Sequence, residues 1–158
     1  MIETPFNYTG SKFKLLEQLL PEFDYTKPYF VDLFCGGGSV YTNVVDKYDK
    51  LIANDVIKDL IGIHQALLHS DDIITETKSI CQNLKISQKD FIELRDSYNL
   101  NPTPSKLWAL MLSCNSNLIR FNQRGKFNQT WGKRSWNSNT ETKVSKFIQH
   151  IRKFSDKI

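Results

Sequence analysis

The stretch FVDLFCGGGSV, residues 30–40, decides the fold, because a run of strand-forming residues breaks into three consecutive glycines and continues as a helical pattern. A central parallel strand buries β-branched and aromatic residues on both faces, and here these are Phe30, Val31, Leu33 and Phe34. The glycines free the backbone and let a ligand approach it closely. We expect Ser39 to cap the following helix, whose free N–H groups face the ligand. The stretch therefore predicts an α/β fold with a cofactor site near the N-terminus.

The glycine spacing narrows the class of cofactor. A dinucleotide fingerprint would place its third glycine where Tyr41 stands, and a phosphate-binding P-loop would need a lysine that does not follow these glycines at the required spacing. The next predicted strand, residues 51–55, ends in Asp55, about twenty positions after the loop, where a carboxylate can accept both hydroxyls of a ribose. The sequence therefore favours a cofactor without phosphates that Asp55 helps to hold.

Four sequence blocks resemble, in order and spacing, the Dam family (D12 class) of S-adenosylmethionine-dependent DNA adenine-N6 methyltransferases. They are NYTGSK (7–12), FVDLFCGGGSV (30–40), AND (53–55) and SNLIRFNQRGKFNQTWGKR (116–134). The resemblance runs over essentially the whole chain but covers only the first part of such an enzyme. It implies a doubly wound, Rossmann-like methyltransferase sheet, here incomplete, with a helical target-recognition insertion and a β-hairpin.

The resemblance also implies that S-adenosylmethionine (SAM) is the cofactor. Lys12 is expected to pair with the SAM carboxylate, with a solvent-exposed lysine as the alternative. Asp32 is expected either to hold the SAM amino group or to cap local backbone donors. Phe34 and Tyr41 are candidates for the adenine pocket, with ordinary core packing as the alternative. The residues predicted to bind SAM are Tyr8, Lys12, Asp32, Phe34, Gly36, Gly38, Ser39 and Asp55.

Positive charge is concentrated in one segment. Residues 116–153 contain nine lysines and arginines and one acidic residue, a net charge of +8 in a chain whose total is +4. Such a segment is expected to bind a polyanion, with a solvated basic surface as the alternative. Residues 118–121 and 126–128 suit two strands around a turn, and such a β-hairpin can enter the major groove of DNA. By resemblance, the residues predicted to contact double-stranded DNA, at a site expected to be GATC, are Leu118, Arg120, Asn122, Arg124, Lys133 and Arg134.

The reaction that the resemblance implies is methyl transfer from SAM to N6 of adenine in duplex DNA. Family members hold the target amine with a DPPY tetrapeptide, and neither DPPY nor NPPY occurs in this chain. We therefore assign no catalytic residue and expect the chain to be inactive alone, as a fragment, a partner of a separate catalytic half, or a remnant. Two alternatives stay open: a non-enzymatic DNA-binding remnant or decoy, and a methyltransferase that acts on RNA.

Three parts are expected along the chain. Residues 1–56 form the SAM-binding part, residues 57–137 form a helical target-recognition domain with the hairpin at 118–134, and residues 138–158 return toward the missing catalytic half. The apolar spacing and the capping residues predict helices at 13–20 (ending at Pro21), at 60–68, at 73–84, after the capping pair Ser87 and Asp90, and from Pro104.

Membrane, disulfide and metal classes are disfavoured. No apolar run approaches membrane-spanning length and the N-terminus lacks a signal-peptide pattern, so we expect a soluble, cytoplasmic protein encoded by a bacterium or a phage. The cysteines are odd in number and far apart, which indicates neither a disulfide framework nor a zinc site: Cys35, Cys81 and Cys114. The histidines are expected to be structural or solvated: His64, His69 and His150.

Overall fold

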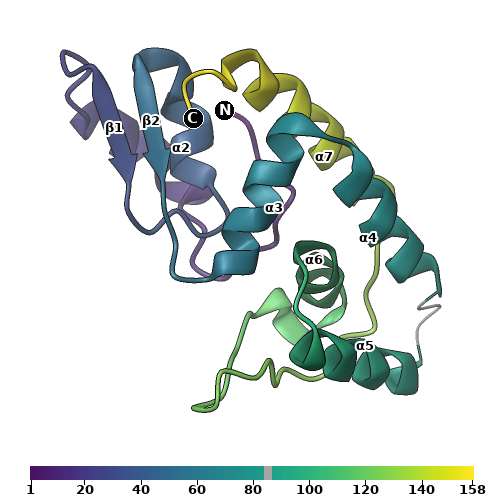
Figure 1. Ribbon diagram of the computed structural model, residues 1–158. Coiled ribbons are helices and arrows are strands. Elements are labelled where there is room, and N and C mark those ends of the chain that lie inside the picture. Colours follow the sequence, from purple (N-terminus) through teal and green to yellow (C-terminus); the bar gives the residue numbers. More distant parts are fainter. Residues whose placement is uncertain (84–86) are drawn as a thin grey trace.

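The computed structural model describes residues 1–83 and 87–158. It combines a small α/β unit, which contains both strands, with a group of helices that carries the predicted hairpin (Figure 1). One hydrophobic core joins the two, and the largest fully buried side chain is Trp108 on α6 (Pro104–Ser113). The predicted mixed α/β class is confirmed.

The α/β unit is built on two parallel strands. β1 (Tyr29–Asp32) leads through the glycines into α2 (Ser39–Val44) and the 3₁₀ turn η3 (Val45–Lys47), and the chain returns as β2 (Lys50–Ala53). Val31 lies opposite Ile52 in the ladder. The glycine loop follows β1 directly, so it lies at the carboxyl end of this strand. It begins the crossover connection that two parallel strands need.

The prediction that β1 is buried on both faces is wrong. Phe30 packs against Phe23 and Tyr48, with ring centroids 5.1 and 5.0 Å apart, but the opposite face is open, and Val31 is 54% exposed. Among the described residues β1 pairs only with β2, so its outer edge has no strand partner. The large apolar side chains that this leaves exposed are Tyr29, Val31, Leu33, Phe34 and Ile52.

Two predicted local features also differ from the structure. The helix expected at 13–20 is a 3₁₀ turn η1 (Phe13–Leu15), a single α-helical turn α1 (Leu16–Leu19) and a second 3₁₀ turn η2 (Leu20–Glu22) that includes Pro21. Ser39 is not a helix cap, because the N-cap of α2 is Gly38 in a left-handed conformation and no side chain caps this helix. The Ser39 hydroxyl instead bonds to that of Ser11.

The helices after β2 follow the predicted order: α3 (Lys58–His69), α4 (Asp72–Asn83), α5 (Gln88–Leu100) and α6. The last residue of the helix expected at 73–84 lies outside the described residues. Ser87 and Asp90 form the predicted capping box, in which each side chain accepts the other's backbone N–H. Pro104 opens α6, with Thr103 as its N-cap.

The helix α7 (Ser138–Ile151) brings the chain back from the helical group to the α/β unit (Figure 1). His150 bonds to the carbonyl of Thr42 at 2.9 Å, and the Leu51 N–H donates to the carbonyl of Lys157 at 2.7 Å. The C-terminal residues therefore lie beside the outer edge of β2. In the described parts of the chain, none of the helices has the length and apolarity that crossing a membrane requires.

Candidate functional site

The glycine loop, residues 36–38, is buried at the carboxyl end of β1. Gly36 has a left-handed backbone with φ +49°, and a Cβ at this position would lie 2.7 Å from a ring carbon of Tyr8. Any side chain at position 36 would therefore be strained and would collide with Tyr8.

The N-terminal loop, residues 7–12, lies over the glycine loop. Its Ser11 hydroxyl is 2.7 Å from the hydroxyl of Ser39, the first residue of α2, and this hydrogen bond ties the N-terminal loop to the helix that follows the glycine loop. Burial, and then the nearby charge of Asp55, raise the pKa of the Tyr8 hydroxyl. Lys12 is exposed, and within the described parts of the chain its ammonium group donates only to the carbonyl of Gly10, at 3.0 Å. Its ammonium group can therefore reach a ligand without breaking an ion pair.

A cavity of about 280 Å³ opens between the two loops, and we call it the glycine-loop cavity. It is bounded by the N-terminal loop, the end of β1, the glycine loop and the start of α2. The predicted SAM-binding residues that line it are Tyr8, Lys12, Asp32, Phe34, Gly36 and Ser39. Gly38 and Asp55 do not line it, so their direct contact with a cofactor stays a prediction.

The two acidic candidates hold backbone donors around the loop. Asp32 Oδ2 accepts the N–H of Tyr41 at 3.2 Å, and burial raises the pKa of this carboxyl. Asp55 Oδ2 accepts the N–H of Gly36 at 3.0 Å, and its Oδ1 accepts the N–H of Ile57 at 3.0 Å. Because each carboxylate oxygen can accept a second hydrogen bond, both residues keep capacity for a ligand.

Two buried residues lie behind the loop: Tyr41, a candidate for the adenine pocket, and His64, which was not among the predicted site residues. Tyr41 is 1% exposed and lies outside the glycine-loop cavity, so core packing describes it. Its hydroxyl is 2.9 Å from Nδ1 of His64, whose Nε2 is 2.8 Å from the carbonyl of Gly36. The sequence signal was available, because His64 falls on the apolar face of α3 with Leu60, Ile63 and Leu67.

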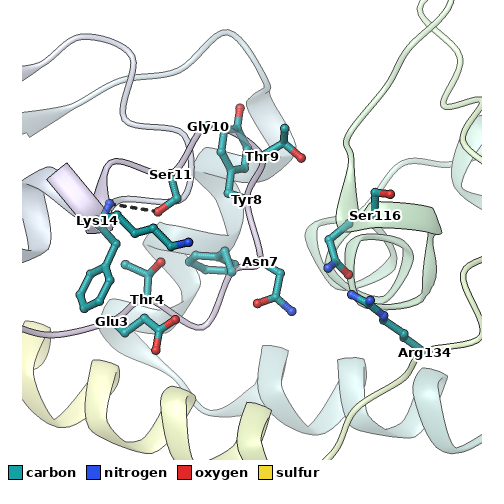
Figure 2. A pocket seen from close by; sticks show the side chains of 13 residues that line it. Glu3, Thr4, Asn7, Tyr8, Thr9, Gly10, Ser11, Lys14, Ser116 and Arg134 are labelled. Carbon is teal, nitrogen blue, oxygen red and sulfur yellow. Dashed lines mark hydrogen bonds between the residues drawn. The ribbon is translucent and has the colours of Figure 1, made fainter.

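A second cavity, of about 510 Å³, lies between the N-terminal loop and the helical group, and we call it the Arg134 cavity. Figure 2 shows Arg134 and Ser116 on one side, facing Asn7 and Tyr8 on the other. With the Asn117 amide assigned so that both of its polar atoms have partners, its oxygen accepts from Arg134 Nη1 at 3.0 Å and its nitrogen donates to the carbonyl of Met111 at 3.2 Å, which orients the arginine. The guanidinium of Arg134, a predicted DNA contact, is thus held in place at the wall of the Arg134 cavity.

The predicted hairpin has one antiparallel bridge, Phe121 with Phe127, rather than two regular strands. Asn122 accepts the N–H groups of Arg124 and Lys126 with its side-chain oxygen, at 2.9 and 3.0 Å, and so shapes the tip. Arg120 is fixed to Asn128 across the two limbs. The other predicted DNA contacts are Leu118, which is half-buried, and Arg124 and Lys133, which are exposed.

The two cavities share a wall. Tyr8, Gly10 and Ser11 line both the glycine-loop cavity and the Arg134 cavity. A small ligand in the first and a nucleotide in the second would therefore lie on opposite sides of the same N-terminal loop. This places a candidate cofactor site directly beside a cationic site.

The cysteines and the acidic residues suggest no other chemistry. All three cysteines are free and buried, and burial raises the pKa of the Cys35 thiol to about 12, which makes it a poor nucleophile. Within residues 1–83 and 87–158, no three histidine, cysteine, aspartate or glutamate side chains are grouped so that they could hold a metal ion.

The family model and the relatives that match this chain all belong to DNA methyltransferases. Residues 8–158 match the family model of the D12 class N6 adenine-specific DNA methyltransferases. The chain is 33% identical over 141 residues to the modification methylase StsI of Streptococcus sanguinis. This alignment covers 84% of the chain and 21% of StsI. It is 29% identical over 137 residues to the type II methyltransferase M.FokI of Planomicrobium okeanokoites (84% and 21%). It is 28% identical over 134 residues to the DNA adenine methylase of Serratia marcescens (80% and 47%). The chain spans between about a fifth and about a half of the length of these relatives.

Proposed function

Because the chain belongs to the D12 class of N6 adenine-specific DNA methyltransferases, we propose that it carries the SAM-binding and DNA-recognition parts of an enzyme that methylates N6 of adenine in duplex DNA. The observation that carries the proposal is the wall that the two cavities share through Tyr8, Gly10 and Ser11. Methyl transfer needs the donor and the extruded base in contact, and the wall between the two sites is the N-terminal loop, which we propose shifts aside and joins them when both ligands bind. The cytoplasm, where bacterial and phage DNA lies, is the proposed compartment.

The residues of the glycine-loop cavity fit SAM chemically. The close approach permitted at Gly36 suits a flat nucleoside, and the exposed ammonium of Lys12 suits its carboxylate. Asp32 and Asp55 are the proposed partners of the amino group and the ribose. The cavity, about 280 Å³, is slightly smaller than the range of roughly 300–1,000 Å³ for small-molecule sites, so we expect Tyr8 to move outward as SAM binds.

In this proposal the chain positions SAM and DNA and supplies no reacting group of its own. SAM, when bound, supplies a methyl group activated by a positive sulfonium. Arg134 and the hairpin hold the DNA backbone and bases, and the N-terminal loop keeps the extruded adenine apart from water. GATC is the proposed site, on the resemblance of residues 116–134 to the Dam-type hairpin.

Two ligand titrations test the proposal. Calorimetry with SAM should give heat, and fluorescence anisotropy should give tighter binding to a GATC duplex than to a duplex with one base pair of the site changed. Duplex binding without SAM heat would favour the DNA-binding remnant or decoy. Stronger competition by single-stranded RNA than by duplex DNA would favour an RNA methyltransferase.

The groups that hold the target amine are proposed to come from polypeptide outside residues 1–158, because DPPY and NPPY are absent. The open face of the sheet supports this, since Val31 and Ile52 are cross-strand neighbours and are 54% and 57% exposed. The β1 edge left unpaired among the described residues could accept a further strand, which would extend the sheet toward a Rossmann-like form.

A reading frame adjoining this one that encodes DPPY would identify the proposed catalytic half. N6-methyladenine should then form only when both polypeptides are present. The double variant Val31→Lys, Ile52→Lys should lose this restored methylation and keep its SAM and duplex binding. Methylation that survives the double substitution would contradict docking on this face.

A further inference from the structure

The peptide groups of Gly36 are held from two directions. The N–H of Gly36 donates to Asp55 Oδ2 at 3.0 Å, and its carbonyl lies 2.8 Å from His64 Nε2. These contacts come from separate parts of the chain, since Asp55 follows β2 and His64 is on α3. We call this arrangement the Gly36 clamp.

The hydrogen bonds determine the tautomer of His64. A carbonyl only accepts, so Nε2 must carry the proton that is donated to Gly36, and Nδ1 of a neutral ring then accepts from the hydroxyl of Tyr41 at 2.9 Å. His64 is 4% exposed, and burial lowers its pKa to about 4, which keeps the ring neutral. The imidazole is therefore a fixed donor aimed at the loop.

Packing leaves this ring little freedom. Phe6 meets it edge-on with ring centroids 4.9 Å apart, and Tyr41 does so at 5.4 Å. Phe6 in turn packs against Trp108 of α6, at 5.6 Å. The ring that holds the glycine loop is thus anchored in the core of the helical group.

We propose that His64 is a positioning residue for the cofactor: through the Gly36 clamp it fixes the glycine loop in the left-handed form that shapes the glycine-loop cavity. This rests on the proposed function, because it assigns the clamp to SAM binding. His64 itself does not line the cavity, so it acts through Gly36.

Two single substitutions separate this role from ordinary core packing. In His64→Gln the side-chain nitrogen matches Nε2 and can still donate to Gly36. In His64→Asn the side-chain oxygen matches Nδ1 and can still accept from Tyr41, but the bond to Gly36 is lost. Each variant loses one hydrogen bond, but Asn is shorter than Gln and also leaves a larger cavity at this buried position, so thermal stability is measured for both. Only His64→Asn should release the loop.

Amide hydrogen exchange in protein labelled with ¹⁵N-glycine measures directly how firmly the glycine loop is held. The exchange of the Gly36 N–H should become about tenfold faster in His64→Asn, the factor expected for one lost buried hydrogen bond, and stay close to the original rate in His64→Gln. The Gly37 ¹⁵N shift should follow, because this nitrogen shares a peptide with the Gly36 carbonyl. Gly125, at the hairpin tip, should not change in either variant.

SAM titration of the same variants tests the consequence. Affinity should fall about tenfold in His64→Asn and be largely kept in His64→Gln. Equal effects of both variants on exchange or on affinity would overturn the positioning role. If His64→Asn does not fold, Asp55→Ala removes the other side of the clamp at a half-exposed position, and unchanged exchange of Gly36 would overturn the clamp. The absence of SAM heat in the unaltered protein would contradict the proposed function, while glycine exchange would still decide the clamp.

Discussion

Arg120 donates from Nε to the side-chain oxygen of Asn128 and from Nη2 to the carbonyl of the same residue, at 2.9 Å in both bonds. The two residues belong to opposite limbs of the hairpin. The guanidinium is therefore held in place before any nucleic acid binds. Its two bonds to Asn128 also fix the directions of its remaining N–H groups.

Arg120→Ala should weaken binding to the GATC duplex by about 1–3 kcal/mol, if the arginine reads a base, and should leave SAM affinity unchanged. Anisotropy and calorimetry on the same preparation measure the two. Asn128→Ala is the matched control, because it releases the guanidinium but keeps its charge, and its loss should be smaller. Equal losses for SAM and DNA would contradict two separate sites.

Arg134→Ala should flatten the dependence of duplex affinity on salt by about one unit of log–log slope, because one phosphate contact is lost. The measurement is duplex affinity over a range of salt concentrations. Arg134→Lys keeps the charge and should keep most of the slope. An unchanged slope in Arg134→Ala would show that this guanidinium does not meet a phosphate.

Gly36→Ala should abolish SAM binding, because position 36 has a left-handed backbone and the new methyl group would fill the space beside the Tyr8 ring, 2.7 Å away, that must open as SAM binds. Gly125→Ala is the control, since Gly125 also has positive φ, +68°, but has nothing within 4 Å of a Cβ. The backbone strain is similar in the two variants, so calorimetry should report loss of SAM only in Gly36→Ala. Loss in both would indicate a general effect on folding.

Stability should fall as the pH drops from about 6.5 to about 4, through protonation of His64. The unfolded chain takes up this proton near the ordinary pKa of 6.5, whereas burial delays uptake in the folded protein to about 4. The stabilisation by neutral His64 is complete above pH 6.5 and is lost between about pH 6.5 and about pH 4. The free energy of unfolding should fall by roughly 3 kcal/mol over this range. Urea unfolding against pH measures it, and His64→Gln, which cannot titrate, should show a shallower fall. Parallel curves would contradict a neutral, buried His64.

Local pattern was enough to predict several elements of the fold. The glycine loop, β2 before Asp55, the capping box at Ser87 and the helix opened by Pro104 all depend on neighbouring residues, and the structure contains each of them. The exposure of Val31 was not predictable in this way, because burial of a strand depends on what packs against it.

The contacts that position the candidate site join residues far apart in sequence. Asp55 reaches Gly36 across 19 positions and His64 reaches it across 28, so no local pattern connects them. Likewise, the family resemblance selected Arg120 and Asn122 for DNA contact, but it did not reveal that both side chains already bond within the hairpin.

The ring of Tyr8 forms part of the boundary of both cavities. A ligand that displaces this ring on one side therefore alters the free energy of binding on the other, and thermodynamic linkage makes the effect reciprocal. The final occupancy then does not depend on the order of addition, and this one aromatic side chain sets the cooperativity between the ligands of the two cavities.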